Sequence, residues 1–465
     1  MNRRRLLQEL SAASPLLWWS PMRAHADPTN CAEVVIDPCS FRTAADPGAA
    51  AGAALRSAVA ALPPEGGSIR LLPGAFQLEP EERRFGRTSV SAGVWLPSNA
   101  QLVGSGPSTV LTVVGSSGGS AIANADFSAG NERLVIRDLT VIGRSASSAR
   151  PGGYFNPPTG DQYRHHGIFL VNAHHFAIEN VEVRGVWGAG FYLANLGPEY
   201  SPSAPSRYCG ASAGRLSGCR AVQCGSYGFW LNGEGTSNIV ISECLVEDVG
   251  GGPLLPKSFS GGHGVLFDSN VFFCRLQNTM IFRAGRADHA GHGIFLIIGC
   301  SFNQISGCLV NDAFETGISV GSGCRQNRLS DCHVQNVRGA AAYAVAAPAG
   351  SNPPTGNQVV NCSADANAGS ACLVMGAPAT QVVGFAAGAD MGTYTSKSAA
   401  SPPVQVERSP GTLLSNLTLL RPSSSVRMPQ YAIVADRESV AQSAEKLESD
   451  NRLFLGALGV VLLKP

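Results

Sequence analysis

A short repeat in the middle of the chain limits what the chain can fold into. Six segments begin with glycine and continue into alternating apolar residues: Gly167-Ile-Phe-Leu, Gly190-Phe-Tyr-Leu, Gly228-Phe-Trp-Leu, Gly264-Val-Leu-Phe, Gly293-Ile-Phe-Leu and Gly317-Ile-Ser-Val. The step from Gly293 to Gly317 is 24 residues, and the longer steps indicate inserted loops. Two or three short strands per ~24 residues form one coil of a solenoid, which buries its apolar side chains only by stacking on the next coil. The repeat therefore predicts an all-β parallel β-helix.

Composition fits this architecture and excludes several others. The chain of 465 residues contains 54 glycines without a Gly-X-Y period, so it is not collagen-like. A leucine-rich repeat would need a regular leucine scaffold, and a β-propeller would need blades of about 40 residues with hairpin signals. Neither pattern is present in the sequence. The net charge is +1, so no charge field indicates a nucleic-acid partner.

A second series of short motifs is interleaved with the first and ends in cysteine. We expect its six cysteines to occupy one equivalent position in successive coils, as a column of small buried thiols: Cys219, Cys244, Cys274, Cys308, Cys332 and Cys362. Cys300 and Cys324 form a second expected column. The spacing between coils is compatible with the geometry of some disulfides, so a few disulfide bonds between coils stay an alternative. No Cys-x-x-Cys pair is present, so we expect no metal cluster at the thiols.

The ends of the chain differ from the repeat region. Residues 1–26 resemble an export signal of the twin-arginine type, with Arg3-Arg4-Arg5, a short apolar stretch and the small-x-small site Ala24-His25-Ala26. We expect the β-helix to span 27–400 and a C-terminal linker and capping segment to span 401–465. No run reaches the ~18 apolar residues that a membrane-spanning helix needs. The protein is therefore expected to be exported, to the periplasm or out of the cell.

The segment before the repeats carries motifs with a known order. A short helix is expected at Leu55–Leu62, ended by two prolines, and it is followed by Gly66-Gly67-Ser68-Ile69, Leu72-Pro73-Gly74-Ala75-Phe76, Leu96-Pro97-Ser98-Asn99 and Leu102-Val103-Gly104-Ser105-Gly106. This order resembles the rhamnogalacturonase/epimerase-like branch of the pectate lyase superfamily. The resemblance implies a right-handed parallel β-helix whose open end is capped by the helix. That superfamily includes hydrolases, lyases, epimerases and phage tail proteins, so the resemblance selects no single reaction.

The Gly-led strands are expected to present aromatic side chains on the outside of the solenoid. Side chains alternate across a strand, so the residues two positions after each glycine should point outward: Phe169, Tyr192, Trp230, Leu266 and Phe295. Aromatic side chains spaced by one coil could stack on sugar rings. Alternatively, a loop, the C-terminal segment or another subunit could cover them, which leaves a homo-oligomer open.

Histidines directly precede three of the glycines. His263 and His292 lie in Gly-His-Gly motifs, which resemble a signature of polygalacturonases, although the upstream pair of aspartates that such hydrolases need is missing. We predict a catalytic cleft in which histidine acts as a general base and carboxylates act as acids or positioning groups. Its predicted catalytic members are His263, Asp268, Asp288 and His292. The predicted substrate-binding residues are Phe169, Tyr192, Trp230, Phe295, Arg286 and His166, and Arg286 together with Lys257 could neutralise a uronate.

Taken together, these patterns predict an exported carbohydrate-active protein. The first hypothesis is a polysaccharide lyase or glycoside hydrolase that acts on an acidic or mixed polysaccharide along a groove of the β-helix. The alternative is a non-catalytic polysaccharide-binding or structural β-helix protein. A calcium-dependent lyase would need clustered carboxylate ligands. The sequence shows no convincing cluster of carboxylates, so no cofactor is identified. Calcium binding stays an alternative that no motif supports.

Overall fold

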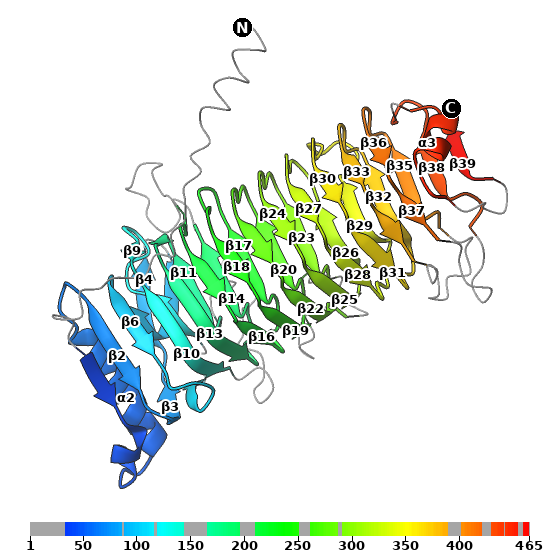
Figure 1. The fold of residues 1–465 in the computed structure, drawn as a ribbon. Helices are drawn as coiled ribbons and strands as arrows, with labels where there is room; N and C mark the ends of the chain where they lie inside the picture. Colours follow the sequence, from blue (N-terminus) through cyan, green and yellow to red (C-terminus); the bar gives the residue numbers. More distant parts are fainter. Residues whose placement is uncertain are drawn as a thin grey trace, which may run out of the picture.

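The chain forms an elongated solenoid that runs from helix α2 at one end to helix α3 and strand β39 at the other, as the computed structural model shows (Figure 1). The structure describes residues 33–85, 88–115, 119–143, 165–195, 210–250, 261–286, 291–388, 401–420, 429–440, 442–453 and 459–464. The expected export signal at residues 1–26 lies outside these ranges. Two long sheets and one short sheet make up the solenoid.

One long sheet, called sheet B here, contains the Gly-led strands. Its strands pair in parallel, apart from the antiparallel pair β4–β5 at its start. They are β4 (Glu81–Phe85), β5 (Thr88–Leu96), β8 (Ser120–Asn124), β11 (Ile168–Val171), β14 (Phe191–Ala194), β17 (Phe229–Asn232), β20 (Val265–Asp268), β23 (Ile294–Ile297), β26 (Thr316–Val320), β29 (Ala341–Ala346), β32 (Ser370–Met375), β35 (Val404–Glu407), β38 (Ile433–Asp436) and β39 (Val461–Lys464).

The second long sheet, sheet A, contributes two rows of parallel strands. The first row contains β1 (Glu33–Ile36), β2 (Gly67–Leu71), β6 (Ala100–Val103), β15 (Arg215–Ser217), β18 (Val240–Ser242), β21 (Arg275–Gln277), β24 (Gln304–Ser306), β27 (Arg328–Ser330), β30 (Gln358–Val360), β33 (Gln381–Val383) and β36 (Leu413–Ser415). The second row contains β3 (Gly74–Leu78), β7 (Thr109–Val113), β16 (Arg220–Val222), β19 (Leu245–Val249), β22 (Met280–Ala284), β25 (Leu309–Ala313), β28 (His333–Gln335), β31 (Ser363–Asp365), β34 (Ala386–Ala387) and β37 (Thr418–Leu419). The longer strands β10 (Val135–Ile142) and β13 (Ala177–Arg184) run through both rows. The short strands β9 (Asn131–Glu132) and β12 (Ala173–His174) pair separately.

The predicted alternation in sheet B is confirmed. Residues one and three positions after each glycine point into the solenoid and form stacked columns of the core. In one of these columns, Phe191 and Phe229 stack with ring centroids 4.7 Å apart. Apolar columns of this kind stabilise the fold because every coil covers the inner surface of its neighbour.

The main cysteine column is confirmed except at one position. Cys219 and Cys244 both lie at the bend between the two rows of sheet A. Cys274 instead precedes β21, the first-row strand of its coil, and buried Thr279 occupies the bend. The placement of Cys274 was therefore wrong, because the motif in this coil ends before the first-row strand and not at the bend between the two rows. The second column is confirmed, since the register that pairs Ser301 with Arg325 aligns the cysteines just before them.

The eleven cysteines within the described ranges are free thiols, and all of them except Cys39 are buried. Burial disfavours the thiolate, and it raises the pKa of Cys224, Cys274 and Cys372 to about 12. We expect an alkylating reagent at pH 8 to label Cys39 in the folded protein and the ten buried thiols only after denaturation. Mass spectrometry of the labelled peptides measures this. Rapid native labelling at Cys224 would contradict the buried column.

Helix α2 (Pro47–Ala60) caps the first coil, and it begins eight residues before the expected helix. The missed start has a clear signal, because the side chain of Asp46 accepts a hydrogen bond from the backbone N–H of Ala49 and Pro47 occupies the first turn. Gly52 allows the helix to touch the sheet, since a Cβ there would lie 1.8 Å from the carbonyl oxygen of Gln77. A short 3-10 helix, η1 (Pro38–Phe41), precedes α2.

The solenoid continues beyond residue 400, where we expected a linker and a capping segment. Strand β35 pairs in parallel with β32, and β38 and β39 extend sheet B to Lys464. The alternation Val404-Gln-Val-Glu that forms β35 follows two prolines, which led the segment to be interpreted as a linker. Helix α3 (Ala444–Ser449) lies in this C-terminal segment, and Ser443 caps its first turn.

Candidate functional site

The outward face of sheet B carries the predicted column of large side chains. The strand register aligns Phe169 with Tyr192, Tyr192 with Trp230, Trp230 with Leu266, and Leu266 with Phe295. These residues form a second apolar cluster, separate from the core inside the solenoid. The outward direction that the sequence predicted is therefore confirmed.

The column divides into a covered half and an accessible half. Phe169 and Tyr192 stack with centroids 4.9 Å apart and are fully buried, and Phe127 packs edge-on against Phe169. Neither ring offers surface to a saccharide, which corrects the substrate-binding role predicted for both. Trp230 and Phe295 remain partly exposed. Only this second half of the column can contact a ligand.

Two of the three histidines accept hydrogen bonds from the backbone of the next coil. Nδ1 of His166 accepts the N–H of Ala189, and Nδ1 of His263 accepts the N–H of His292. A neutral imidazole that accepts at Nδ1 carries its proton on Nε2, so it has no free lone pair with which to act as a base. His166 is also fully buried and packs on Tyr192, so its predicted substrate contact is corrected as well.

His292 has a different environment from the other two histidines. Its Nε2 lies 3.4 Å from Oε2 of Glu315, and its Nδ1 is buried without a hydrogen-bond partner among the described residues. Burial lowers the pKa of His292 to about 4, so the ring is neutral at pH 7. The carboxyl group of Glu315 is half-buried, and burial raises its pKa. The imidazole ring also contacts Phe295, with centroids 4.2 Å apart. This is a carboxyl group positioned by a neutral histidine beside an accessible aromatic ring.

Asp268 lies at the other end of the same surface. It ends β20, and its carboxylate accepts a hydrogen bond from the hydroxyl of Ser269 at 2.9 Å. Burial raises the pKa of Asp268, and the hydrogen bond from Ser269 opposes that shift. Asn232, its neighbour in register, donates to the hydroxyl of Tyr192. Asp268 is therefore a carboxyl group with an elevated pKa at the carboxyl ends of the strands.

The predicted common cleft is only partly assembled. His263 and His292 stack with centroids 5.0 Å apart, but Asp268 lies at the opposite end of its strand from His263. Glu315 directly precedes β26, two strands beyond β20. At about 3.3 Å per residue and about 4.8 Å per strand, roughly 22 Å separates the backbones of Asp268 and Glu315. Their two side chains shorten this gap by only a few Å, whereas paired glycosidase carboxyls lie about 5–9.5 Å apart. Asp268 and Glu315 therefore do not form such a pair.

Arg286 belongs to the same end of the sheet as His292 and Glu315. A Cβ on Gly291 would lie 2.4 Å from Cα of Gly285, which places the backbone before Arg286 against the backbone before His292. The Arg286 side chain is partly exposed. The predicted residues Asp288 and Lys257 lie outside the described ranges.

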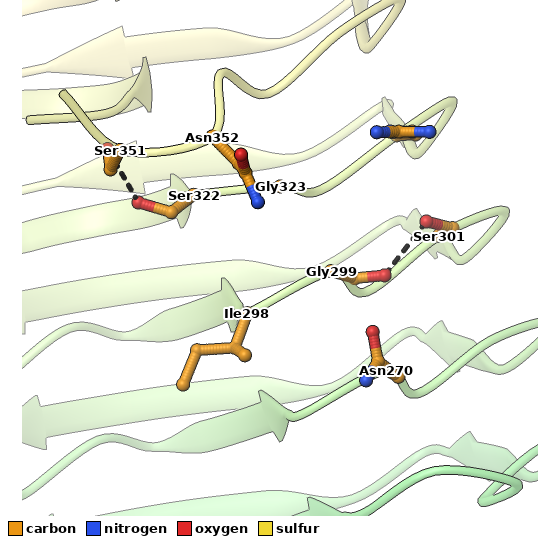
Figure 2. Close-up of a pocket in the computed structure, with 9 residues that line it drawn as sticks. Asn270, Ile298, Gly299, Ser301, Ser322, Gly323, Ser351 and Asn352 are labelled. Atoms are coloured by element: carbon orange, nitrogen blue, oxygen red, sulfur yellow. Dashed lines mark hydrogen bonds between the residues drawn. The ribbon is translucent and has the colours of Figure 1, made fainter.

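A cavity of about 560 Å³ lies beyond the carboxyl ends of β20, β23 and β26 (Figure 2). Its lining residues come from successive turns between sheet B and the first row of sheet A: Asn270, Ile298, Gly299, Ser301, Ser322, Gly323, Arg325, Ser351 and Asn352. The hydroxyl groups of Ser322 and Ser351 are hydrogen-bonded to each other at 3.2 Å. The cavity continues the accessible half of the outward face on the side of Asp268.

Within the described ranges, no group of three or more His, Cys, Asp or Glu side chains is placed to hold a metal ion. The helices in those ranges are all too short or too polar to cross a lipid bilayer.

Sequence reasoning missed two features of this surface. Glu315 was not among the predicted site residues, although its place just before a Gly-led strand puts it in the same turn as the histidines of earlier coils. The cavity was missed because its residues are turn residues with no motif. Small and amide side chains after each strand were its only signal.

The pH dependence of stability should report the buried state of His292. Because its pKa falls from 6.5 to about 4 on folding, the unfolded chain binds a proton that the folded chain does not. The contribution of neutral His292 to the free energy of unfolding is therefore complete above pH 6.5 and is lost as the pH falls toward 4. We expect the wild type to lose about 3 kcal/mol more unfolding free energy over this window than His292→Asn. Urea unfolding at several pH values measures the difference, and parallel curves would exclude a buried neutral His292.

Comparisons with known proteins agree with the architecture. Residues 166–385 match the family model of the right handed beta helix region. The catalytic domain of a GH87 alpha-1,3-glucanase in complex with nigerose superposes with a TM-score of 0.50 at 12% identity, covering 96% of this chain and 70% of that chain. The A-module of the Azotobacter vinelandii mannuronan C-5 epimerase AlgE6 gives a TM-score of 0.46 at 15% identity, covering 92% of this chain and 99% of that chain. No curated protein sequence matches the chain. The matched region and the stacked parallel coils show that the chain folds as a right-handed parallel β-helix.

Proposed function

We propose that this chain is an exported carbohydrate-active protein that cleaves an acidic polysaccharide by elimination. The observation that carries the proposal is the contact of Glu315 with His292 beside Phe295. It combines a partly exposed carboxyl group, a neutral positioning imidazole and an accessible aromatic ring. The glucanase of the same fold binds a saccharide, which supports a carbohydrate as the ligand.

The accessible half of the outward face provides the binding surface. Trp230 and Phe295 lie on strands separated only by β20, so roughly 10 Å separates their positions along the solenoid axis. Aromatic rings at such spacing can contact the apolar faces of sugar units. Because Phe169 and Tyr192 are buried, the surface for saccharide begins at Trp230.

The proposed reaction assigns proton transfer to Glu315. Its carboxylate removes the proton from the carbon next to a uronate carboxyl, the electron pair forms the new C=C bond, and the glycosidic C–O bond at the adjacent carbon breaks. The departing oxygen takes a proton from water. Burial raises the pKa of Glu315 and makes its carboxylate a stronger base than an exposed one. His292 positions Glu315, and Arg286 stabilises the charge that develops on the uronate.

Hydrolysis is the alternative reaction, and the described carboxyl groups support it less. An inverting or retaining hydrolase needs two carboxyls within about 5–9.5 Å, and Asp268 is too distant from Glu315. Elimination needs only one base and a cation for the uronate. We therefore place elimination first.

A polysaccharide panel tests the proposal. The purified protein is incubated with uronate-containing and neutral polysaccharides while the absorbance of unsaturated products and the number of reducing ends are recorded together. We expect both signals to rise with a uronate polymer. New reducing ends without absorbance would show a hydrolase, and saccharide binding without either signal would show the non-catalytic alternative.

Export is a separate part of the proposal and rests on residues 1–26. We expect replacement of the first two arginines of the Arg3-Arg4-Arg5 run by lysine to leave the precursor in the cytoplasm. Cell fractionation with an antibody against the protein detects this. An unchanged distribution would overturn the twin-arginine route.

A further inference from the structure

The cavity beyond the carboxyl ends of β20, β23 and β26 is distinct from the proposed reaction site. Glu315 precedes the amino end of β26, whereas the cavity opens after its carboxyl end, so the length of the strand lies between them. At about 3.3 Å per residue, the seven residues from Glu315 to Ser322 span roughly 23 Å, or about four sugar units. A bound polymer could occupy both places at once.

Arg325 supplies the cavity with a positive charge. The residue is exposed, and its guanidinium forms no hydrogen bond or ion pair with any residue in the described ranges. Arginines on the opposite side of the solenoid are engaged, since Arg283 pairs with Asp248 and Arg338 pairs with Asp312. No carboxylate lines the cavity. Its charge is therefore suited to an anionic ligand.

Two amides and one apolar side chain complete the recognition surface. The side chains of Asn270 and Asn352 line the cavity and form no hydrogen bonds with described residues. Ile298 is 53% exposed at the same place. Figure 2 shows these three residues on stacked turns of the solenoid. Free amides bind hydroxyl groups, and an exposed aliphatic surface suits the apolar face of a pyranose.

Glycines keep the cavity open. Gly299 has a φ of 79°, and a Cβ there would lie 2.3 Å from Oδ1 of Asn270. Gly323 in the next coil has a φ of 72°. Both positions require the left-handed conformation that glycine adopts without strain, and the absence of side chains leaves the space free.

We propose that this cavity is a uronate-binding subsite in which Arg325 binds the sugar carboxylate and Asn270 and Asn352 bind its hydroxyl groups. The inference rests on the proposed function, because it assumes that a polysaccharide lies along the outward face. It adds that an acidic unit is selected at a distance from the reacting bond. Recognition of this kind discriminates between substrates by charge at a subsite that undergoes no chemistry.

Calorimetric titration of the full chain carrying Glu315→Gln, which is expected to slow turnover, tests the subsite. The two probes are an oligogalacturonate and its carboxyl-reduced, neutral counterpart. We expect Arg325→Gln to weaken oligogalacturonate binding about 10-fold, as for the loss of one charge-assisted hydrogen bond, and to leave the neutral probe unchanged. Asn352→Asp should also weaken only the acidic probe. The matched control is Arg275→Gln, because Arg275 is exposed on β21 outside the cavity.

The outcomes separate this inference from the proposed function. Equal affinity of Arg325→Gln and its parent for oligogalacturonate would overturn the subsite, as would an equal loss for both probes. Preference of the parent for the neutral probe would overturn the subsite while the carbohydrate function stands. Binding of neither probe would overturn both.

Discussion

Replacing Glu315 by glutamine should lower kcat on the uronate polymer by about 10²–10⁴-fold, the contribution expected of a group that transfers a proton in the transition state. The substitution keeps the size of the side chain and its contact with His292 but removes the basic oxygen. Binding should change little, because the amide still fits beside Phe295. The initial rate of product absorbance over a range of substrate concentrations separates kcat from KM.

The pH profile provides a second readout for the same residue. A base is active only when ionised, so kcat of the wild type should fall as the pH drops through the raised pKa of Glu315. The residual activity of Glu315→Gln should lack this acidic limb. Glu243→Gln is the matched control, since Glu243 is exposed at a bend of sheet A away from this surface. A Glu315→Gln variant with wild-type kcat and folding would remove Glu315 from the reaction.

Replacing Phe229 by alanine should destabilise the fold by about 3–5 kcal/mol. Phe229 is fully buried in the solenoid and stacks on Phe191 with an interplanar angle of 7°. Parallel pairing with β14 and β20 fixes the backbone on both sides of Phe229. The neighbouring coils therefore cannot move into the cavity that the substitution leaves. Urea unfolding followed by circular dichroism measures the loss.

An exposed phenylalanine serves as the control for this change. Phe273 is 52% exposed on a turn, so Phe273→Ala should change the unfolding free energy by about 0.5 kcal/mol or less. Equal losses at the two positions would show that the column of rings inside sheet B does not determine stability. An unchanged stability in Phe229→Ala would contradict the register of the coils.

The sequence by itself determined the parallel β-helix and the direction of the side chains in sheet B. The Gly-led motifs and the alternation that follows them are local, and side-chain direction in a strand depends only on odd or even position. Phe191 was therefore placed inside and Trp230 outside without any long-range information. The cysteine column followed from the same argument, and it failed at Cys274, where spacing alone could not show which of two bends the motif occupies.

Only the tertiary structure decided which outward residues are accessible and which polar groups meet. Tyr192 and Trp230 occupy equivalent positions, yet one is buried and the other is partly exposed. His263 and His292 share one motif, yet the first accepts a backbone N–H and the second faces Glu315. These differences depend on the register between coils and on the length of each inserted loop, which no local pattern encodes.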